Sequence, residues 1–252
     1  MKNSSLRKLI IIISFMLAPI TFIYISPVII VLDAVSGIIS GSFILYCTLF
    51  ITSLITGRLF CSRLCPIGGA QECLAAAVSK PVKNSKPLHI IRHIIWILWL
   101  GLVLFIIVTN GGYSAVKPLN HSFRGLSLHT EGGNAYMIYF IILAALVVCT
   151  IVFGKRAGCH MICPMANFMI IGRKLGRLLR LPGFYLKTDA GKCSGCKKCV
   201  TVCQMSLDIE EIVKKNMSEG SNCILCGDCV KACPKEAVQI GFGVAGKKRE
   251  AS

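Results

Sequence analysis

Eight of the 15 cysteines fall in two runs toward the C-terminal end of the chain. The runs "CSGCKKCVTVC" and "CILCGDCVKACP" share the spacing C-x2-C-x2-C-x3-C, which is typical of bacterial iron–sulfur proteins. Three closely spaced cysteines wrap a loop around one cubane, and the fourth lies on the following helix and reaches the other cubane. The spacing predicts two [4Fe-4S] clusters, one held by Cys193, Cys196, Cys199 and Cys233, the other by Cys223, Cys226, Cys229 and Cys203.

Zinc is the alternative occupant of such runs, but zinc sites use C-x2-C pairs separated by a longer loop. The first run departs from the pattern in one respect, because Gln204 stands where a proline would follow the fourth cysteine. Lys192, Lys197 and Lys198 crowd the first run. Three interpretations of these lysines remain open from the sequence: they offset the charge of the cluster, they dock an acidic partner, or they form a solvated basic face.

Two further cysteine pairs have the spacing C-x3-C-P, in "CSRLCP" and "CHMICP", and each follows an apolar segment. Cysteines four residues apart lie on one face of a helical turn. The residue before a proline is disfavoured in the α conformation, and the proline can open the next helix. If the two halves of the chain pack together, four thiols meet at one surface: Cys61, Cys65, Cys159 and Cys163.

Such a set would hold a further iron–sulfur centre or act as redox-active thiols. The basic residues Arg58, Arg63, Lys155 and Arg156 would stabilise the thiolates, and His160 lies within the second motif as a candidate ligand or tuning group. In the alternative interpretation, each motif has no redox role and serves only to turn the chain. We expect one shared redox site that links the two ferredoxin clusters to the membrane interior.

The elements that must position these cysteines are strongly apolar. The chain of 252 residues is 54% hydrophobic with a mean hydropathy of +0.70. A membrane-spanning helix needs about 20 apolar residues, and the segments that approach this length are Leu9 to Leu32, Ala34 to Gly57, Ile94 to Thr109 and Tyr136 to Phe153. The first two could instead form a re-entrant pair.

The predicted fold is therefore a membrane all-α four-helix bundle, built as two parallel two-helix repeats over residues 1–184. After residue 184 the long apolar runs end and cysteines become frequent. This change of composition predicts an α+β ferredoxin-like domain over residues 185–242. Residues 243–252 are predicted to be a disordered tail.

The net charge of +17 requires an acidic surface as partner, and the apolar runs favour membrane lipid over nucleic acid. With four helices and a cytoplasmic N-terminus, the inner segments hold 26 Lys and Arg and the outer segments hold 2. This positive-inside asymmetry predicts that both termini are cytoplasmic. The loop between the third and fourth helices, "GGYSAVKPLNHSFRGLSLHTEGG", is predicted to be external.

Apolar helices, two C-x3-C-P motifs and a C-terminal two-cluster module occur together in one known group. The chain resembles the NapH/MauN group of membrane-bound ferredoxin-type proteins, which are kin to the membrane parts of NosR and of CcoG (RdxA/FixG). The motifs "CSRLCP" and "CHMICP", combined with the double ferredoxin run, carry the resemblance, which covers nearly the whole chain.

The resemblance implies electron transfer at a bacterial or archaeal cytoplasmic membrane, as a subunit of a quinol dehydrogenase system. The implied partners are a quinone or quinol and an extracytoplasmic redox protein that contains flavin, haem or iron–sulfur. Two alternatives remain: a CcoG-like copper reductase or metallocofactor-assembly protein, and a redox-sensing membrane regulator. The flavin domain of NosR-like proteins and the extracytoplasmic domain of CcoG-like proteins have no counterpart here, which favours the NapH-like interpretation.

Overall fold

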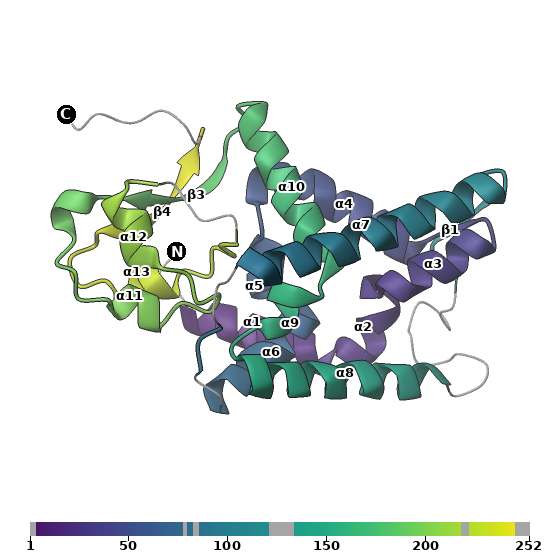
Figure 1. The fold of residues 1–252 in the computed structure, drawn as a ribbon, viewed down its shortest axis with the longest axis horizontal. Helices are drawn as coiled ribbons and strands as arrows, with labels where there is room; N and C mark the ends of the chain where they lie inside the picture. The colour runs from purple at the N-terminus through teal and green to yellow at the C-terminus, as the bar shows by residue number, and fades with distance from the viewer. Residues whose placement is uncertain (1–3, 78–79, 83–85, 121–133, 218–221, 245–252) are drawn as a thin grey trace.

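A computed structural model describes residues 4–77, 80–82, 86–120, 134–217 and 222–244. A small cysteine-rich domain lies at one end, and long helices extend away from it (Figure 1). Most of the predicted external loop (121–133) and of the predicted tail (245–252) lies outside the described residues.

The first apolar run is divided into three helices instead of one. They are α1 (Ser4–Met16), α2 (Ala18–Ile25) and α3 (Pro27–Val35). Proline has no N–H and its ring clashes with the carbonyl four residues earlier, so Pro19 and Pro27 occur only in first turns. Ser26, which precedes Pro27, is extended at φ −76° and ψ 120°, as this position favours.

The other apolar runs also form helices, with some change of bounds. The second begins later than predicted, because Gly37 has φ +66° and a short strand follows it. That strand pairs in parallel with a strand that follows the third run, with Ile38 opposite Ala115. The elements are β1 (Ile38–Ser40), α4 (Gly41–Thr56), α7 (Lys86–Thr109), β2 (Ala115–Lys117) and α8 (Asn134–Phe153).

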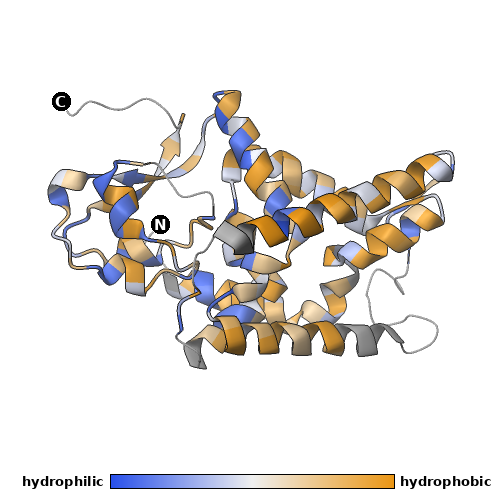
Figure 2. Ribbon diagram, in the orientation of Figure 1, coloured by the Kyte–Doolittle hydropathy of each residue, from blue (hydrophilic) through white to orange (hydrophobic). Residues whose placement is uncertain are grey.

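Two stretches of the described residues are long and apolar enough to cross a membrane: Ala18–Val35 and Ile90–Thr109. The apolar helices Gly41–Thr56 and Phe140–Phe153 fall short of that length. The described helices thus give two spans of full length where the sequence predicts four. Figure 2 shows that the helices extending away from the cysteine-rich domain are predominantly hydrophobic.

Each C-x3-C-P motif forms a short helix followed by a longer one. These are α5 (Leu59–Arg63) and α6 (Pro66–Ala77) in the first half, and α9 (Ala157–Met161) and α10 (Pro164–Leu178) in the second. Helix α6 packs on α1, whereas α10 packs along α4 in the other half. At Gly172 and Gly176 of α10, an added Cβ would overlap Ser53 and Leu54 of α4, so these glycines permit the close approach.

The cysteine-rich domain has the α+β character predicted for a ferredoxin. Its antiparallel strands run in register from Gly183 opposite Gly243 to Thr188 opposite Val238, so the ordered domain begins at Gly183. Its elements are β3 (Gly183–Thr188), η1 (Ala190–Lys192), α11 (Lys198–Thr201), α12 (Ile209–Lys214), α13 (Asp228–Ala232) and β4 (Val238–Gly243).

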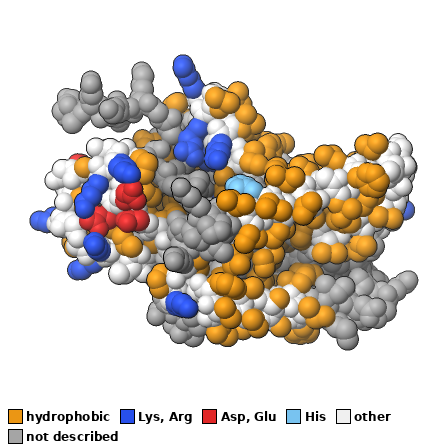
Figure 3. Space-filling model, viewed as in Figure 1, with side chains coloured by type: hydrophobic (Ala, Val, Ile, Leu, Met, Phe, Trp, Pro, Cys, Tyr) orange, Lys and Arg blue, Asp and Glu red, His pale blue; other side chains and the backbone are white. Residues whose placement is uncertain are grey.

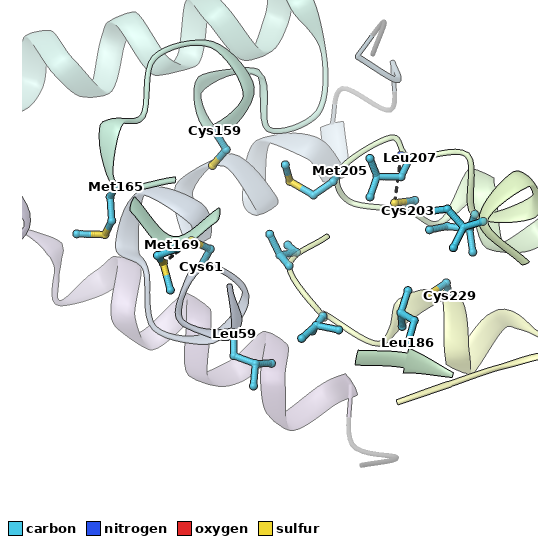
Figure 4. Close-up of a cluster of buried hydrophobic side chains, with 14 of the residues drawn as sticks. Leu59, Cys61, Cys159, Met165, Met169, Leu186, Cys203, Met205, Leu207 and Cys229 are labelled. Carbon is cyan, nitrogen blue, oxygen red and sulfur yellow. Dashed lines mark hydrogen bonds between the residues drawn. The ribbon is translucent and has the colours of Figure 1, made fainter. Parts of the chain in front are cut away.

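One buried hydrophobic cluster joins the two parts of the molecule. It includes Cys61 and Cys159 from the helical part and Cys203 and Cys229 from the ferredoxin-like domain. Met205 belongs to the same cluster and is 1% exposed. Figure 4 shows these side chains within one continuous region. The two kinds of cysteine motif are therefore positioned by a shared core.

Candidate iron–sulfur sites

The two C-x3-C-P motifs fold alike, and the proline opens a helix in each, as predicted. Cys65 donates its backbone N–H to the carbonyl of Phe60 at 3.0 Å, and α6 begins at the next residue. Cys163 is extended at φ −65° and ψ 110°, and α10 begins at Pro164. Both second cysteines therefore lie where one helix stops and another starts.

The structure brings the four thiols of these motifs together; three of the cysteines are buried and Cys163 is partly exposed. Cys61, Cys65 and Cys159 are 5–7% exposed. Burial raises the pKa of the Cys65 thiol, and the three other thiols lie close enough to raise it further. Burial, followed by the charges of Cys159 and Cys61, raises the pKa of Cys163 to about 12. The four thiols thus lie close together at one place in the fold.

This group does not have the geometry of a single metal ion. In the described part of the chain, no three Cys, His, Asp or Glu side chains converge in a way that would hold one ion. A four-iron cubane is larger and holds its thiolates farther apart. Four sulfur donors are the ligand set that a [4Fe-4S] cluster takes, so the donor chemistry fits a cluster.

Four buried arginines surround the thiols. Arg7, Arg58, Arg92 and Arg156 are 0–4% exposed. Two N–H groups of Arg58, at Nε and Nη2, have no hydrogen-bond acceptor among the described residues. Among the described residues, the carboxylates that pair with these arginines are those of Glu72 and Asp228, so the four guanidinium groups outnumber their carboxylate partners by two. Burying unpaired charge costs several kcal/mol, and a thiolate-ligated cluster would supply negative charge here.

One carboxylate organises the first half of this arrangement. Glu72 accepts hydrogen bonds from Arg7 at 2.8 Å and from Arg156 at 2.6 Å. Arg156 also donates to the carbonyl oxygen of Cys61 at 3.0 Å. Burial alone would raise the pKa of the Glu72 carboxyl, but the two arginines outweigh it and hold the pKa below its usual range. Glu72 is therefore ionised and fixes both guanidinium groups beside the first motif.

Two polar bridges join the thiol group to the ferredoxin-like domain. Arg7 donates to the carbonyl of Ser62, between the first two motif cysteines, and to both oxygens of Asp228 at 3.2 Å. Arg58 donates to the backbone carbonyl of Asn222 at 3.1 Å, and Arg92 donates to its side-chain oxygen at 3.0 Å. Asn222 immediately precedes a predicted cluster ligand, so the arginines lie between two predicted centres.

The ferredoxin cysteines surround two hollows. Each hollow is lined by three cysteines of one run and the fourth cysteine of the other. These are the two sets that crossed ligation requires, and the cluster assignment itself stays a prediction. The first hollow is lined by Cys193, Cys196, Cys199 and Cys233, and the second by Cys203, Cys223, Cys226 and Cys229.

Backbone N–H groups point at sulfurs in both hollows. Leu207 donates to Cys203 at 3.3 Å, and Ala237 donates to Cys233 at 3.3 Å. Gly195 and Gly227 have φ of +68° and +83°, a conformation that favours glycine and helps the loop amides face an anion. Hydrogen bonds of this kind to sulfur tune the potential of an iron–sulfur centre.

Crossed ligation makes a specific prediction. Cys203→Ser should damage the centre held by Cys223, Cys226 and Cys229 and leave the centre of its own run intact, because its sulfur faces the second hollow. EPR of the reduced full-length protein measures this, with Cys73→Ser as the control because Cys73 is an exposed thiol outside both hollows. An altered signal from the first-run centre alone would contradict the assignment.

Sequence reasoning identified only part of the charged surroundings. Of the four basic residues proposed to stabilise the thiolates, Arg58 and Arg156 are fully buried beside them, while Arg63 and Lys155 are partly exposed. His160 is fully buried. Four further residues of these surroundings were not predicted from the sequence: Arg7, Arg92, Glu72 and Asn222. One signal was available, because Glu72 is the only acidic residue between positions 33 and 131.

Comparisons with known proteins agree with these sites. A family described as a 4Fe-4S dicluster domain matches residues 192–238. A second family, described as a 4Fe-4S binding domain, matches twice, at residues 40–85 and 135–182. Each of these two segments contains one C-x3-C-P motif. The same family therefore matches both halves of the chain, in agreement with the repeat predicted from the sequence. No solved structure matches the chain.

Several curated proteins are similar over most of the chain. An uncharacterized protein of Methanocaldococcus jannaschii is 28% identical over 79% of this chain and 77% of its own length. YccM of Escherichia coli, named for electron transport, is 22% identical over 77% of this chain and 54% of its own length. MauN of Methylobacillus flagellatus, named as a methylamine utilization ferredoxin-type protein, is 23% identical over 60% of this chain and 49% of its own length. The chain thus spans about half the length of YccM and of MauN. It is an iron–sulfur protein related to the ferredoxin-type electron-transport proteins, as its motifs predicted.

Proposed function

We propose that the chain is a membrane-anchored electron relay with three iron–sulfur centres. Eight ferredoxin cysteines would hold two of them, and Cys61, Cys65, Cys159 and Cys163 would hold the third. The observation that carries the proposal is the group of four motif thiols, three of them from buried residues, beside buried arginines that outnumber their carboxylate partners. A [4Fe-4S] cluster, once bound, accepts and releases one electron at a time.

The chain's own residues have two roles in this relay. The cysteines would hold the centres, and the polar bridges through Asn222 and Asp228 fix the ferredoxin-like domain against the helical part that carries the motif cysteines. Arg58 and Arg156 stabilise negative charge at the motif cysteines. The surrounding apolar core, which includes Met169 beside Cys61 at 3.6 Å, excludes water.

Exposed apolar side chains support membrane anchoring. On α7, Leu98, Phe105 and Val108 are 67–78% exposed, and on α8 Phe140 and Ile141 are each 61% exposed. Figure 3 shows hydrophobic atoms over most of the helical part, and charged atoms at the ferredoxin-like end and around α10. Large exposed apolar surfaces mark membrane or partner contacts, so we place the helices in a cytoplasmic membrane. We propose four passes, and for that arrangement the charge asymmetry would place both termini inside.

For the membrane partner we propose a quinone or quinol, with an extracytoplasmic redox protein as the further partner. The relay would carry electrons between the quinone pool or a cytoplasmic donor and that protein. This part of the proposal rests on the likeness to ferredoxin-type relatives, one of which is named for electron transport.

Inside-out membrane vesicles that contain the full-length chain test this function. With its clusters reduced and excess reductant removed, the wild type should be oxidised by an added short-chain quinone, followed as loss of the reduced-cluster EPR signal. The double variant Cys65→Ser/Cys163→Ser should respond at least about tenfold more slowly, because the path from the ferredoxin centres is cut. Oxidation by Cu(II) with no response to quinone would instead support the copper-reductase alternative.

A further inference from the structure

The two ferredoxin hollows differ in their access to solvent. The second hollow faces the helical part, where Arg7 binds Asp228 and Arg58 binds Asn222. Two of its cysteines, Cys203 and Cys229, are only 7–8% exposed. A soluble protein cannot approach this hollow closely, because the helical part already covers it.

The first hollow faces the opposite way. Its Cys196 is exposed, and the hollow is lined by Lys197 and Lys235. Figure 1 places α11 and α12 at the end of the molecule farthest from the outer ends of α3 and α7. Lipid around the apolar helices is therefore at the other end of the molecule, and the first hollow is the point at which a soluble partner can reach a cluster.

Some of the charged side chains around the first hollow form ion pairs, and others do not. Three ion pairs neutralise its periphery: Asp189 with Lys192, Glu210 with Lys214, and Glu211 with Lys215. In contrast, three exposed lysines form no ion pair among the described residues, and we name them the lysine collar: Lys197, Lys198 and Lys235. Glu236, beside Lys235, is the acidic neighbour of this collar, so the collar keeps a net positive charge.

We infer that the lysine collar is the docking surface for a soluble, acidic one-electron carrier protein. The inference rests on the proposed electron relay and names its cytoplasmic partner class. In the docked complex, one electron passes between the carrier's redox group and the cluster held by the first cysteine set, so that one is oxidised and the other is reduced. No bond is made or broken, and no proton is required.

Complementary charge steers such an encounter and raises its rate by about 10- to 1000-fold. Reversing two collar charges with Lys197→Glu/Lys235→Glu should therefore slow reduction of the protein by a reduced flavodoxin, used as the acidic probe, by about tenfold or more at low salt. The difference should disappear toward about 1 M salt, where the screening length is near 3 Å. Reduction by a neutral photoreduced deazaflavin should be unchanged.

The matched control is a double charge reversal on the same domain, Lys187→Glu/Lys231→Glu, at two exposed positions that do not line the first hollow. It should slow the flavodoxin reaction by less than about threefold, because its charges lie away from the docking point. A second readout does not depend on electron transfer: carbodiimide should cross-link flavodoxin carboxylates to collar lysines, located by mass spectrometry.

The inference is overturned if the control slows the reaction as much as the collar variant, or if cross-links map outside the collar. It is also overturned if the wild-type rate does not depend on salt. Failure of the relay itself looks different: flavodoxin would still reduce the wild type in a collar-dependent way, but quinone would not reoxidise it in vesicles.

Discussion

Cys65→Ser/Cys163→Ser should remove about four of roughly twelve irons from each full-length chain. The variant loses one thiol from each C-x3-C-P motif, and these thiols lie together in a buried group. The ferredoxin hollows draw on eight other cysteines, so their centres should remain. Iron and acid-labile sulfide analysis of the purified protein, with EPR of the reduced state, measures the loss.

The control for this experiment removes the same number of thiols elsewhere. Cys47→Ser/Cys73→Ser replaces two exposed cysteines and should keep the full iron content. If wild type and Cys65→Ser/Cys163→Ser both contain about eight irons, the third centre does not exist, and the motifs either turn the chain or act as thiols.

Glu72→Gln should destabilise the protein by about 3–5 kcal/mol, since removing one partner of a buried ion pair leaves an uncompensated buried charge. Here two guanidinium groups that are 0–4% exposed, those of Arg7 and Arg156, lose the Glu72 carboxylate at once, and Arg7 retains its ion pair with Asp228. Denaturant unfolding of the detergent-solubilised protein, followed by tryptophan fluorescence and cluster absorbance, measures the change.

A matched substitution distinguishes the effect of breaking a buried ion pair from the effect of removing one negative charge. Glu211→Gln breaks an exposed pair with Lys215 and should cost less than about 1 kcal/mol. Equal effects of the two substitutions would contradict a special role for the buried network.

The depressed pKa of Glu72 also predicts how pH acts on stability. The ionised carboxylate stabilises the fold fully above its unfolded pKa of about 4.3, and this contribution is lost as pH falls through the lower folded pKa. Glu72→Gln should remove that part of the acid sensitivity.

The cysteine motifs allow more of the helix boundaries to be predicted than the apolar runs do. The proline after each C-x3-C pair predicted where α6 and α10 begin, because proline restricts the residue before it and fits the first helical turn. The apolar runs predicted helices but not their breaks, since Pro19 and Pro27 can either kink or divide a helix. The local sequence was thus sufficient to predict where helices begin at the cysteine motifs, but it left the breaks within the apolar runs undetermined.

The buried charges could not be predicted in the same way. Arg7 and Asp228 are 221 residues apart along the chain, and Arg58 and Asn222 are 164 apart. Each taken alone has the appearance of an ordinary surface residue near a membrane. Their pairing depends on how the ferredoxin-like domain sits against the helices, which no short sequence pattern encodes.

The packing of α10 along α4 has a consequence for biosynthesis. Arg173 of α10 contacts Leu54 of α4 across 119 residues of chain. The surface of α4 that receives Gly172 and Gly176 therefore leaves the ribosome well before its partner is made. During that interval the surface of α4 at Ser53 and Leu54 is not yet covered by α10, and the two thiols of the first motif lack their counterparts. Loading of the proposed third centre, which needs all four motif cysteines, would therefore follow completion of the second half, and translation would set the earliest moment for it.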